Sequence, residues 1–150
     1  MPPSRHRLLI VDDEPGIRDV LQEILNSSGY EVDTAGNGNE ALERITPGRY
    51  DVIISDLCMP EMDGEQFYAK VHDSQPVLAK RMVFVTGDTV SPKSRAFLEA
   101  TGNLWLAKPF NISDVERVVR DLCREAPIMD LTANTSLNPV AVRRYNPITN

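Results

Sequence analysis

A chain of 150 residues, 41% hydrophobic and 25% charged, has the length and composition of one globular domain, which excludes the disordered and fibrous classes. The formal net charge is −6 and no long run of lysine or arginine occurs, so we expect no nucleic-acid-binding surface. Two cysteines do not make a disulfide framework, and the first apolar run is too short for a signal peptide or membrane span; we therefore expect a cytoplasmic protein.

The first half of the chain alternates between short apolar runs and amphipathic segments. Residues 8–11 form a continuous apolar run, typical of a strand covered on both faces of a parallel sheet. A helix is predicted next, because Pro15 opens it, apolar residues recur at helical spacing, and Gly29 closes it. Residues 30–35 alternate and predict a weaker edge strand, and residues 40–45 predict a short helix.

The second half continues the same alternation. Three further apolar runs predict buried strands: residues 52–54, 82–85 and 104–107. Three helical patterns accompany them: residues 65–73, a helix that Ser91 and Pro92 open and Gly102 ends, and a helix that begins at Asn111.

Five repeats of strand and helix predict a three-layer α/β domain with a parallel sheet between helices. We assign residues 1–125 to this domain. Residues 126–150 contain three prolines, four asparagines and no sustained period, so we expect them to form a flexible C-terminal tail or linker.

Charged or hydroxyl side chains follow four of the predicted strands at the point where each strand ends. These residues are Asp12 and Asp13, then Asp56, Thr86 and Lys108. The carboxyl ends of parallel strands share one edge of the sheet, which is where such folds place their sites. We therefore expect three carboxylates, one hydroxyl and one ammonium to converge.

Three carboxylates so close together repel one another unless a proton or a cation joins them. Mg²⁺ fits this set, since it prefers hard oxygen ligands and often pairs carboxylates with a phosphate oxygen. A carboxylate beside Mg²⁺ can attack phosphorus to give an aspartyl phosphate. Lys108 would neutralise charge on the phosphoryl oxygens, and Thr86 would offer a hydroxyl to one of them.

Four segments in this order and spacing look like the signatures of response-regulator receiver domains of two-component systems. They are Val-Asp-Asp-Glu at residues 11–14, the run from Asp56 to Gly64, Val-Thr-Gly at residues 85–87, and Lys-Pro-Phe at residues 108–110. The resemblance covers roughly residues 6–125. It implies a flavodoxin-like (βα)5 fold with strand order 2-1-3-4-5 and a cis peptide at Lys108–Pro109.

The resemblance also implies a role for each site residue. Asp56 would be the phosphorylated residue, and Mg²⁺ would be held by Asp12, Asp13 and Asp56 with the backbone carbonyl of Cys58. Thr86 and Lys108 would supply the hydroxyl and the amine of the site. In the family's switch, the threonine hydroxyl moves inward and an aromatic residue on the fifth strand follows; Trp105 takes that position here, where Tyr or Phe is commoner.

By the same resemblance the chain is not an enzyme acting on a separate substrate, although it assists its own phosphorylation and dephosphorylation. The donor would be a phosphohistidine on a histidine kinase or a histidine phosphotransfer protein. Residues 85–88 and 97–102 resemble receivers attached to hybrid histidine kinases, so both a stand-alone regulator and an excised domain remain open. A homodimer also remains open.

Three alternatives differ in class. A degenerate receiver would bind partners without phosphorylation, but no acceptor-site residue is missing. An aspartyl-nucleophile phosphatase would want a second aspartate two residues after the nucleophile, where this chain has Cys58. A flavin-binding flavodoxin is least favoured, because the acidic residues after the first strand would repel a phosphate there.

Overall fold

The computed structural model describes residues 5–46, 49–87 and 91–125. Their eleven elements follow in chain order: β1 (Arg7–Val11), α1 (Pro15–Ser27), β2 (Glu31–Ala35), α2 (Gly38–Ile45), β3 (Val52–Asp56), α3 (Gly64–Ser74), α4 (Pro76–Ala79), β4 (Met82–Thr86), α5 (Pro92–Thr101), β5 (Trp105–Ala107) and α6 (Ile112–Glu125). Residues 126–150 lie outside the described residues, so the tail stays a prediction.

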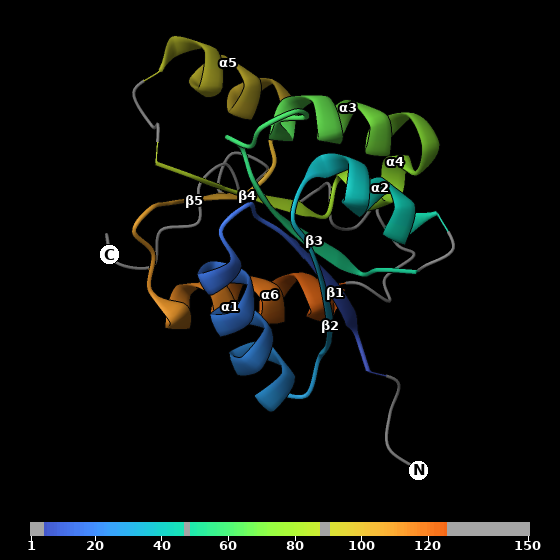
Figure 1. Cartoon of the computed structure of the whole chain (residues 1–150), viewed down its shortest axis with the longest axis vertical. Coiled ribbons are helices and arrows are strands. Elements are labelled where there is room, and N and C mark those ends of the chain that lie inside the picture. The colour runs from blue at the N-terminus through green and yellow to red at the C-terminus, as the bar shows by residue number, and fades with distance from the viewer. Residues whose placement is uncertain (1–4, 47–48, 88–90, 126–150) are drawn as a thin grey trace.

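The five strands form one parallel sheet in the order β2-β1-β3-β4-β5, which confirms the predicted flavodoxin-like order and the edge position of the second strand. Helices α1 and α6 cover one face, and α2, α3, α4 and α5 cover the other (Figure 1). The three predicted layers are therefore confirmed.

The continuous apolar runs follow from burial on both faces. In β1, Leu8 and Ile10 pack into the core beneath α1 and α6, whereas Leu9 and Val11 pack into the opposite core beneath α2 and α3. All four side chains are at most 1% exposed. A strand with two buried faces is therefore mostly apolar until it ends, and the buried Ser55 of β3 satisfies its hydroxyl by donating to the Asp56 carbonyl.

One helix was not predicted. Helix α4 has only four residues and begins at Pro76, directly after Gln75, the residue that caps the end of α3. Four residues are too few to show a helical period, so the pattern could not reveal it. The other differences are shifts of one or two residues at element ends: α2 begins at Gly38 because Asn37 caps it, and β5 begins at Trp105.

Strand β5 is short and lies at the edge of the sheet, so its position depends on contacts around it. The buried Asn103 side chain donates hydrogen bonds of 2.8 Å each to the backbone carbonyls of Ala79 and Met82, which fixes the turn before β5. After β5, the Lys108 N–H donates to the Thr86 carbonyl at 2.9 Å. The peptide bond between Lys108 and Pro109 is cis, as predicted.

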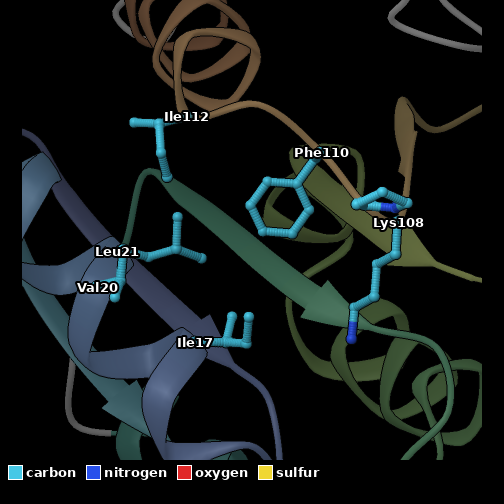
Figure 2. Close-up of a pocket in the computed structure, with 7 residues that line it drawn as sticks. Ile17, Val20, Leu21, Lys108, Phe110 and Ile112 are labelled. Atoms are coloured by element: carbon cyan, nitrogen blue, oxygen red, sulfur yellow. The ribbon is translucent and has the colours of Figure 1, made fainter.

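An apolar groove of about 470 Å³ opens between α1 and the segment that joins β5 to α6. It is lined by Ile17, Val20, Leu21, Lys108, Pro109, Phe110 and Ile112. Figure 2 shows Lys108 leaving the groove and extending toward the carboxyl end of β3. The groove therefore continues into the edge of the sheet where the strands end.

Candidate functional site

The predicted acidic residues meet at the carboxyl edge of the sheet. Asp56 is the last residue of β3, and Asp12 and Asp13 directly follow β1. Each of the three offers a carboxylate oxygen, and these oxygens all lie within 4.8 Å of one another. Asp12 and Asp56 are buried, whereas Asp13 is exposed. The predicted convergence of the three carboxylates is confirmed.

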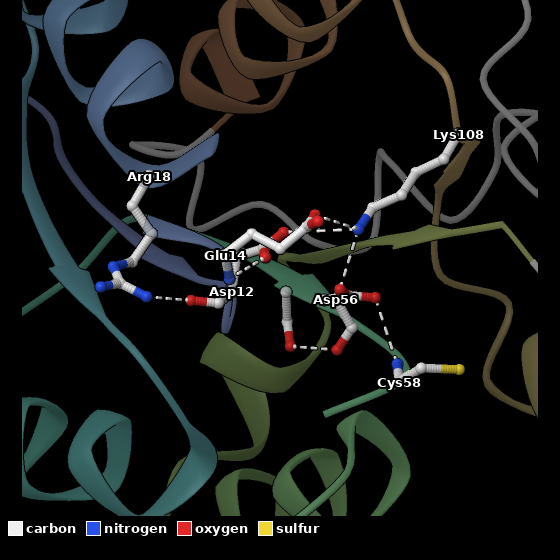
Figure 3. A network of polar contacts seen from close by, with 7 residues as sticks. Asp12, Glu14, Arg18, Asp56, Cys58 and Lys108 are labelled. Carbon is white, nitrogen blue, oxygen red and sulfur yellow. Dashed lines mark hydrogen bonds and ion pairs between the residues drawn. The ribbon is translucent and has the colours of Figure 1, made fainter. Parts of the chain in front are cut away.

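The Lys108 ammonium lies between the carboxylates of Asp12, Glu14 and Asp56 (Figure 3). Its Nζ is 2.9 Å from Oδ2 of Asp56, 3.6 Å from Oδ2 of Asp12 and 3.6 Å from Oε1 of Glu14. The side chains of Asp12 and Asp56 are only 5% and 6% exposed, so water screens these two charges poorly. Lys108 is therefore the main counter-charge to two buried carboxylates.

The turn between β1 and α1 fixes the position of Asp12. Its Oδ1 accepts a hydrogen bond of 2.8 Å from the Glu14 N–H, and its backbone carbonyl accepts one of 2.6 Å from Nη1 of Arg18. Figure 3 shows Arg18 reaching back along α1 to this carbonyl. Neither contact was predicted, because no sequence pattern distinguishes this arginine from an ordinary charge on a helix surface.

The turn between β3 and α3 holds Asp56 in the same way. The Cys58 N–H donates to Oδ1 of Asp56 at 3.1 Å, and the Gly64 N–H donates to the Leu57 carbonyl at 2.8 Å. A Cβ on Gly64 would lie 2.7 Å from the Asp56 carbonyl oxygen, so only glycine allows this close approach.

A capping box then starts α3 directly after this turn. Asp63 and Gln66 each accept a hydrogen bond from the other's backbone N–H. This capping box was not predicted from the sequence. The reciprocal cap fixes where α3 begins, and with it the distance of Gly64 from Asp56.

Burial and neighbouring charges have opposite effects on the pKa values of Asp12 and Lys108. Burial raises the pKa of Asp12, although the Glu14 N–H and the Lys108 charge partly oppose the rise. Burial alone would lower the pKa of Lys108, but its hydrogen bond to Asp56 and the nearby charges of Asp56, Asp12 and Glu14 outweigh burial and raise it. Lys108 therefore stays charged near neutral pH, while Asp12 ionises less readily than a free aspartate.

These residues fit a hard divalent cation. Three oxygen donors within 4.8 Å are the kind of ligands that Mg²⁺ takes, and the burial that disfavours the Asp12 carboxylate would be offset by a cation beside it. Asp12, Asp13 and Asp56 would hold the ion. The predicted contribution of the Cys58 carbonyl stays a prediction; the N–H of this exposed residue donates to Asp56.

The two predicted switch residues lie on neighbouring strands. Thr86 is fully buried and ends β4, and its backbone pairs with that of Ala107 in β5. Trp105, opposite Phe84, is half-buried and packs against the core on the side of α3 and α5. The role of both residues in a switch, and their movement, stay predictions.

Comparison with known proteins places this arrangement in a known family. The chain is 34% identical over 116 residues to the response regulator Rre1 of Synechocystis, an alignment that covers 77% of this chain and 50% of that protein. The chemotaxis protein CheY4 of Vibrio cholerae superposes with a TM-score of 0.71 at 36% identity, over 79% of this chain and 99% of that one.

TrrA of Thermotoga maritima, solved in complex with Mg²⁺ and BeF, superposes with a TM-score of 0.67 at 31% identity, over 78% of this chain and 98% of that one. The chain spans about half the length of the curated relatives it matches.

The fold and the acidic edge of the sheet define a signalling domain of the CheY-like type. The family model described as "Response regulator receiver domain" matches residues 8–120, so the chain belongs to that family. The predicted family is thereby confirmed, and the chain is a receiver domain of two-component systems. None of the helices in the described part of the chain is long and apolar enough to cross a membrane.

The raised pKa of Asp12 predicts a stabilising substitution. The folded protein holds this proton more tightly than the unfolded chain, so the Asp12 contribution to stability falls as pH rises from 3.8, its ordinary value, through the folded pKa. At neutral pH in EDTA, Asp12→Asn should raise the free energy of unfolding by on the order of 1 kcal/mol, measured by urea denaturation.

This gain in the free energy of unfolding should shrink as the pH falls toward 3.8, because folded wild-type Asp12 then takes up its proton and becomes neutral, as the asparagine is. Asp19→Asn, an exposed carboxylate on α1, is the matched control and should change stability little. A loss of stability for Asp12→Asn at neutral pH would contradict this electrostatic account.

Proposed function

We propose that this receiver domain accepts a phosphoryl group on Asp56 in a Mg²⁺-dependent reaction, with a phosphohistidine of a histidine kinase or phosphotransfer protein as the donor. The observation that carries the proposal is the hydrogen bond between Lys108 and a buried Asp56 inside a cluster of three carboxylates. The relative TrrA, solved with Mg²⁺ and BeF, supports it.

In the proposed reaction, a carboxylate oxygen of Asp56 forms a bond to phosphorus while the bond from phosphorus to the donor's imidazole nitrogen breaks. The electron pair of that bond stays on the imidazole nitrogen. Bound Mg²⁺ would neutralise negative charge on the phosphoryl oxygens. The contacts of Asp56 with Cys58 and Lys108 hold the nucleophile in position before the donor arrives.

Lys108 and Thr86 have proposed roles after the transfer. Lys108 already donates to Oδ2 of Asp56 at 2.9 Å, so a short movement of its ammonium would bring it to a phosphoryl oxygen. Thr86 ends the strand next to β3, and its hydroxyl would donate to another phosphoryl oxygen. The inward movement of the Thr86 hydroxyl, followed by movement of Trp105, is the proposed switch.

The groove beside α1 suits the docking of the donor. Its lining includes Lys108, which also contacts Asp56, so a protein that brings a phosphohistidine to Asp56 lies next to the groove. Val20 is 48% exposed and lies next to the other apolar side chains of the groove, and a contiguous apolar surface of this kind marks an interaction site. We propose that the apolar face of a donor helix packs here.

Intact-mass spectrometry tests the acceptor chemistry. The protein is incubated with Mg²⁺ and acetyl phosphate, beside an EDTA sample and the Asp56→Asn variant. We expect one added phosphoryl group that is lost in both controls, because the variant lacks the nucleophile and EDTA removes the cation. The absence of an adduct on a folded protein that binds Mg²⁺ would favour instead a receiver that acts without phosphorylation.

The groove predicts a selective effect of Val20→Asp. Phosphorylation by acetyl phosphate should be unchanged, because the variant leaves the site intact. Transfer from a histidine kinase that phosphorylates the wild type should slow by about tenfold or more, since covering the exposed half of Val20 is worth about 1 kcal/mol and burying an aspartate there instead adds a further cost.

Val77→Asp is the matched control for this substitution. Val77 is a valine of α4 that is 59% exposed on the other face of the sheet. The Val77→Asp variant should be phosphorylated at the wild-type rate by acetyl phosphate and by the kinase. Equal rates of kinase-dependent transfer for Val20→Asp and the wild type would rule out docking of the donor in this groove.

A further inference from the structure

Glu14 has an unusual position for a residue that begins a helix. It is the N-cap residue of α1, yet its side chain makes no capping hydrogen bond with the described residues. Its carboxylate instead lies 3.6 Å from Nζ of Lys108. A glutamate at this position would ordinarily be explained by the helix dipole, but here its charge faces the phosphoacceptor site.

Glu14 does not belong to the cluster of three aspartates that would hold the metal. The carboxylate oxygens that lie within 4.8 Å of one another belong to Asp12, Asp13 and Asp56. Glu14 extends from the same turn toward Lys108 from the solvent side, and its side chain is 61% exposed (Figure 3). Its effect on the site is therefore that of a nearby charge and a competing partner for Lys108.

The local charges show what this position does. Three carboxylates, those of Asp12, Glu14 and Asp56, lie within 3.6 Å of the Lys108 ammonium, and the Asp13 carboxylate lies within 4.8 Å of those of Asp12 and Asp56. A fourth negative charge favours an entering cation and disfavours an entering anion. Glu14 also attracts the ammonium that the phosphoryl group needs, so its two effects on anion binding have the same sign.

We propose that Glu14 is a positioning residue for Lys108 that sets the balance between the affinity of the site for Mg²⁺ and its affinity for the phosphoryl group. The inference rests on the proposed phosphoacceptor function and deepens it. A carboxylate at position 14 strengthens binding of the metal and weakens binding of the phosphoryl group, because the phosphoryl group must draw Lys108 away from Glu14.

The substitution Glu14→Gln tests this proposal, since it keeps the size of the side chain and removes the charge. Two affinities are measured by isothermal titration calorimetry: Mg²⁺ alone, and beryllofluoride at saturating Mg²⁺ as a stand-in for the phosphoryl group. We expect Mg²⁺ to bind about two- to fivefold more weakly and beryllofluoride about two- to fivefold more tightly, the range for exposed ion pairs.

Two controls separate a local charge effect from other causes. Asp19→Asn removes one exposed carboxylate farther along α1, where no ion pair with Lys108 is seen, and should leave both affinities unchanged. Both shifts in Glu14→Gln should shrink from low to high salt, because Glu14 is exposed and its charge is screened.

Opposite shifts of the two affinities support the proposal, since a loss of local structure would weaken both ligands together. Equal affinities in the variant and the wild type, or a parallel loss of both, would overturn it. Failure of the wild type to bind Mg²⁺ would overturn the proposed phosphoacceptor function itself, and this inference with it.

Discussion

The ion pair between Lys108 and Asp56 is the contact on which the site depends. Its 2.9 Å hydrogen bond links the residue that follows β5 to the end of β3, across the end of β4. The same ammonium also pairs with Asp12, which directly follows β1. Two nearly buried carboxylates are stable there because Lys108 opposes their charge, and Asp12 still ionises with difficulty. The site is thus short of positive charge, and that shortage is what a cation would relieve.

The architecture explains why these charges meet at one edge. Strands covered on both faces are mostly apolar, so charged groups collect where the strands end. Parallel strands then bring all these ends to one side of the sheet. The turns complete the site with backbone contacts: Arg18 holds the Asp12 carbonyl, and Gly64 lets α3 approach Asp56.

The sequence predicted the fold and the central site residues, because both depend on patterns that a strand imposes locally. An apolar run that ends in an acid or a lysine indicates a buried strand whose polar end lies at the carboxyl edge of the sheet, and the structure confirms this position for Asp12, Asp56 and Lys108. What the sequence missed depends on contacts between distant segments or on very short elements. Helix α4 has too few residues for a period, and the pairing of Glu14 with Lys108 joins residues far apart in the chain.

The most direct test of the central claim identifies the phosphorylated residue. After reaction with acetyl phosphate and Mg²⁺, borohydride reduces an aspartyl phosphate to homoserine, and peptide mass spectrometry locates the modified residue. The account predicts homoserine at position 56 and nowhere else. Homoserine at Asp12 or Asp13, or none in a protein that has gained a phosphoryl group, would contradict it.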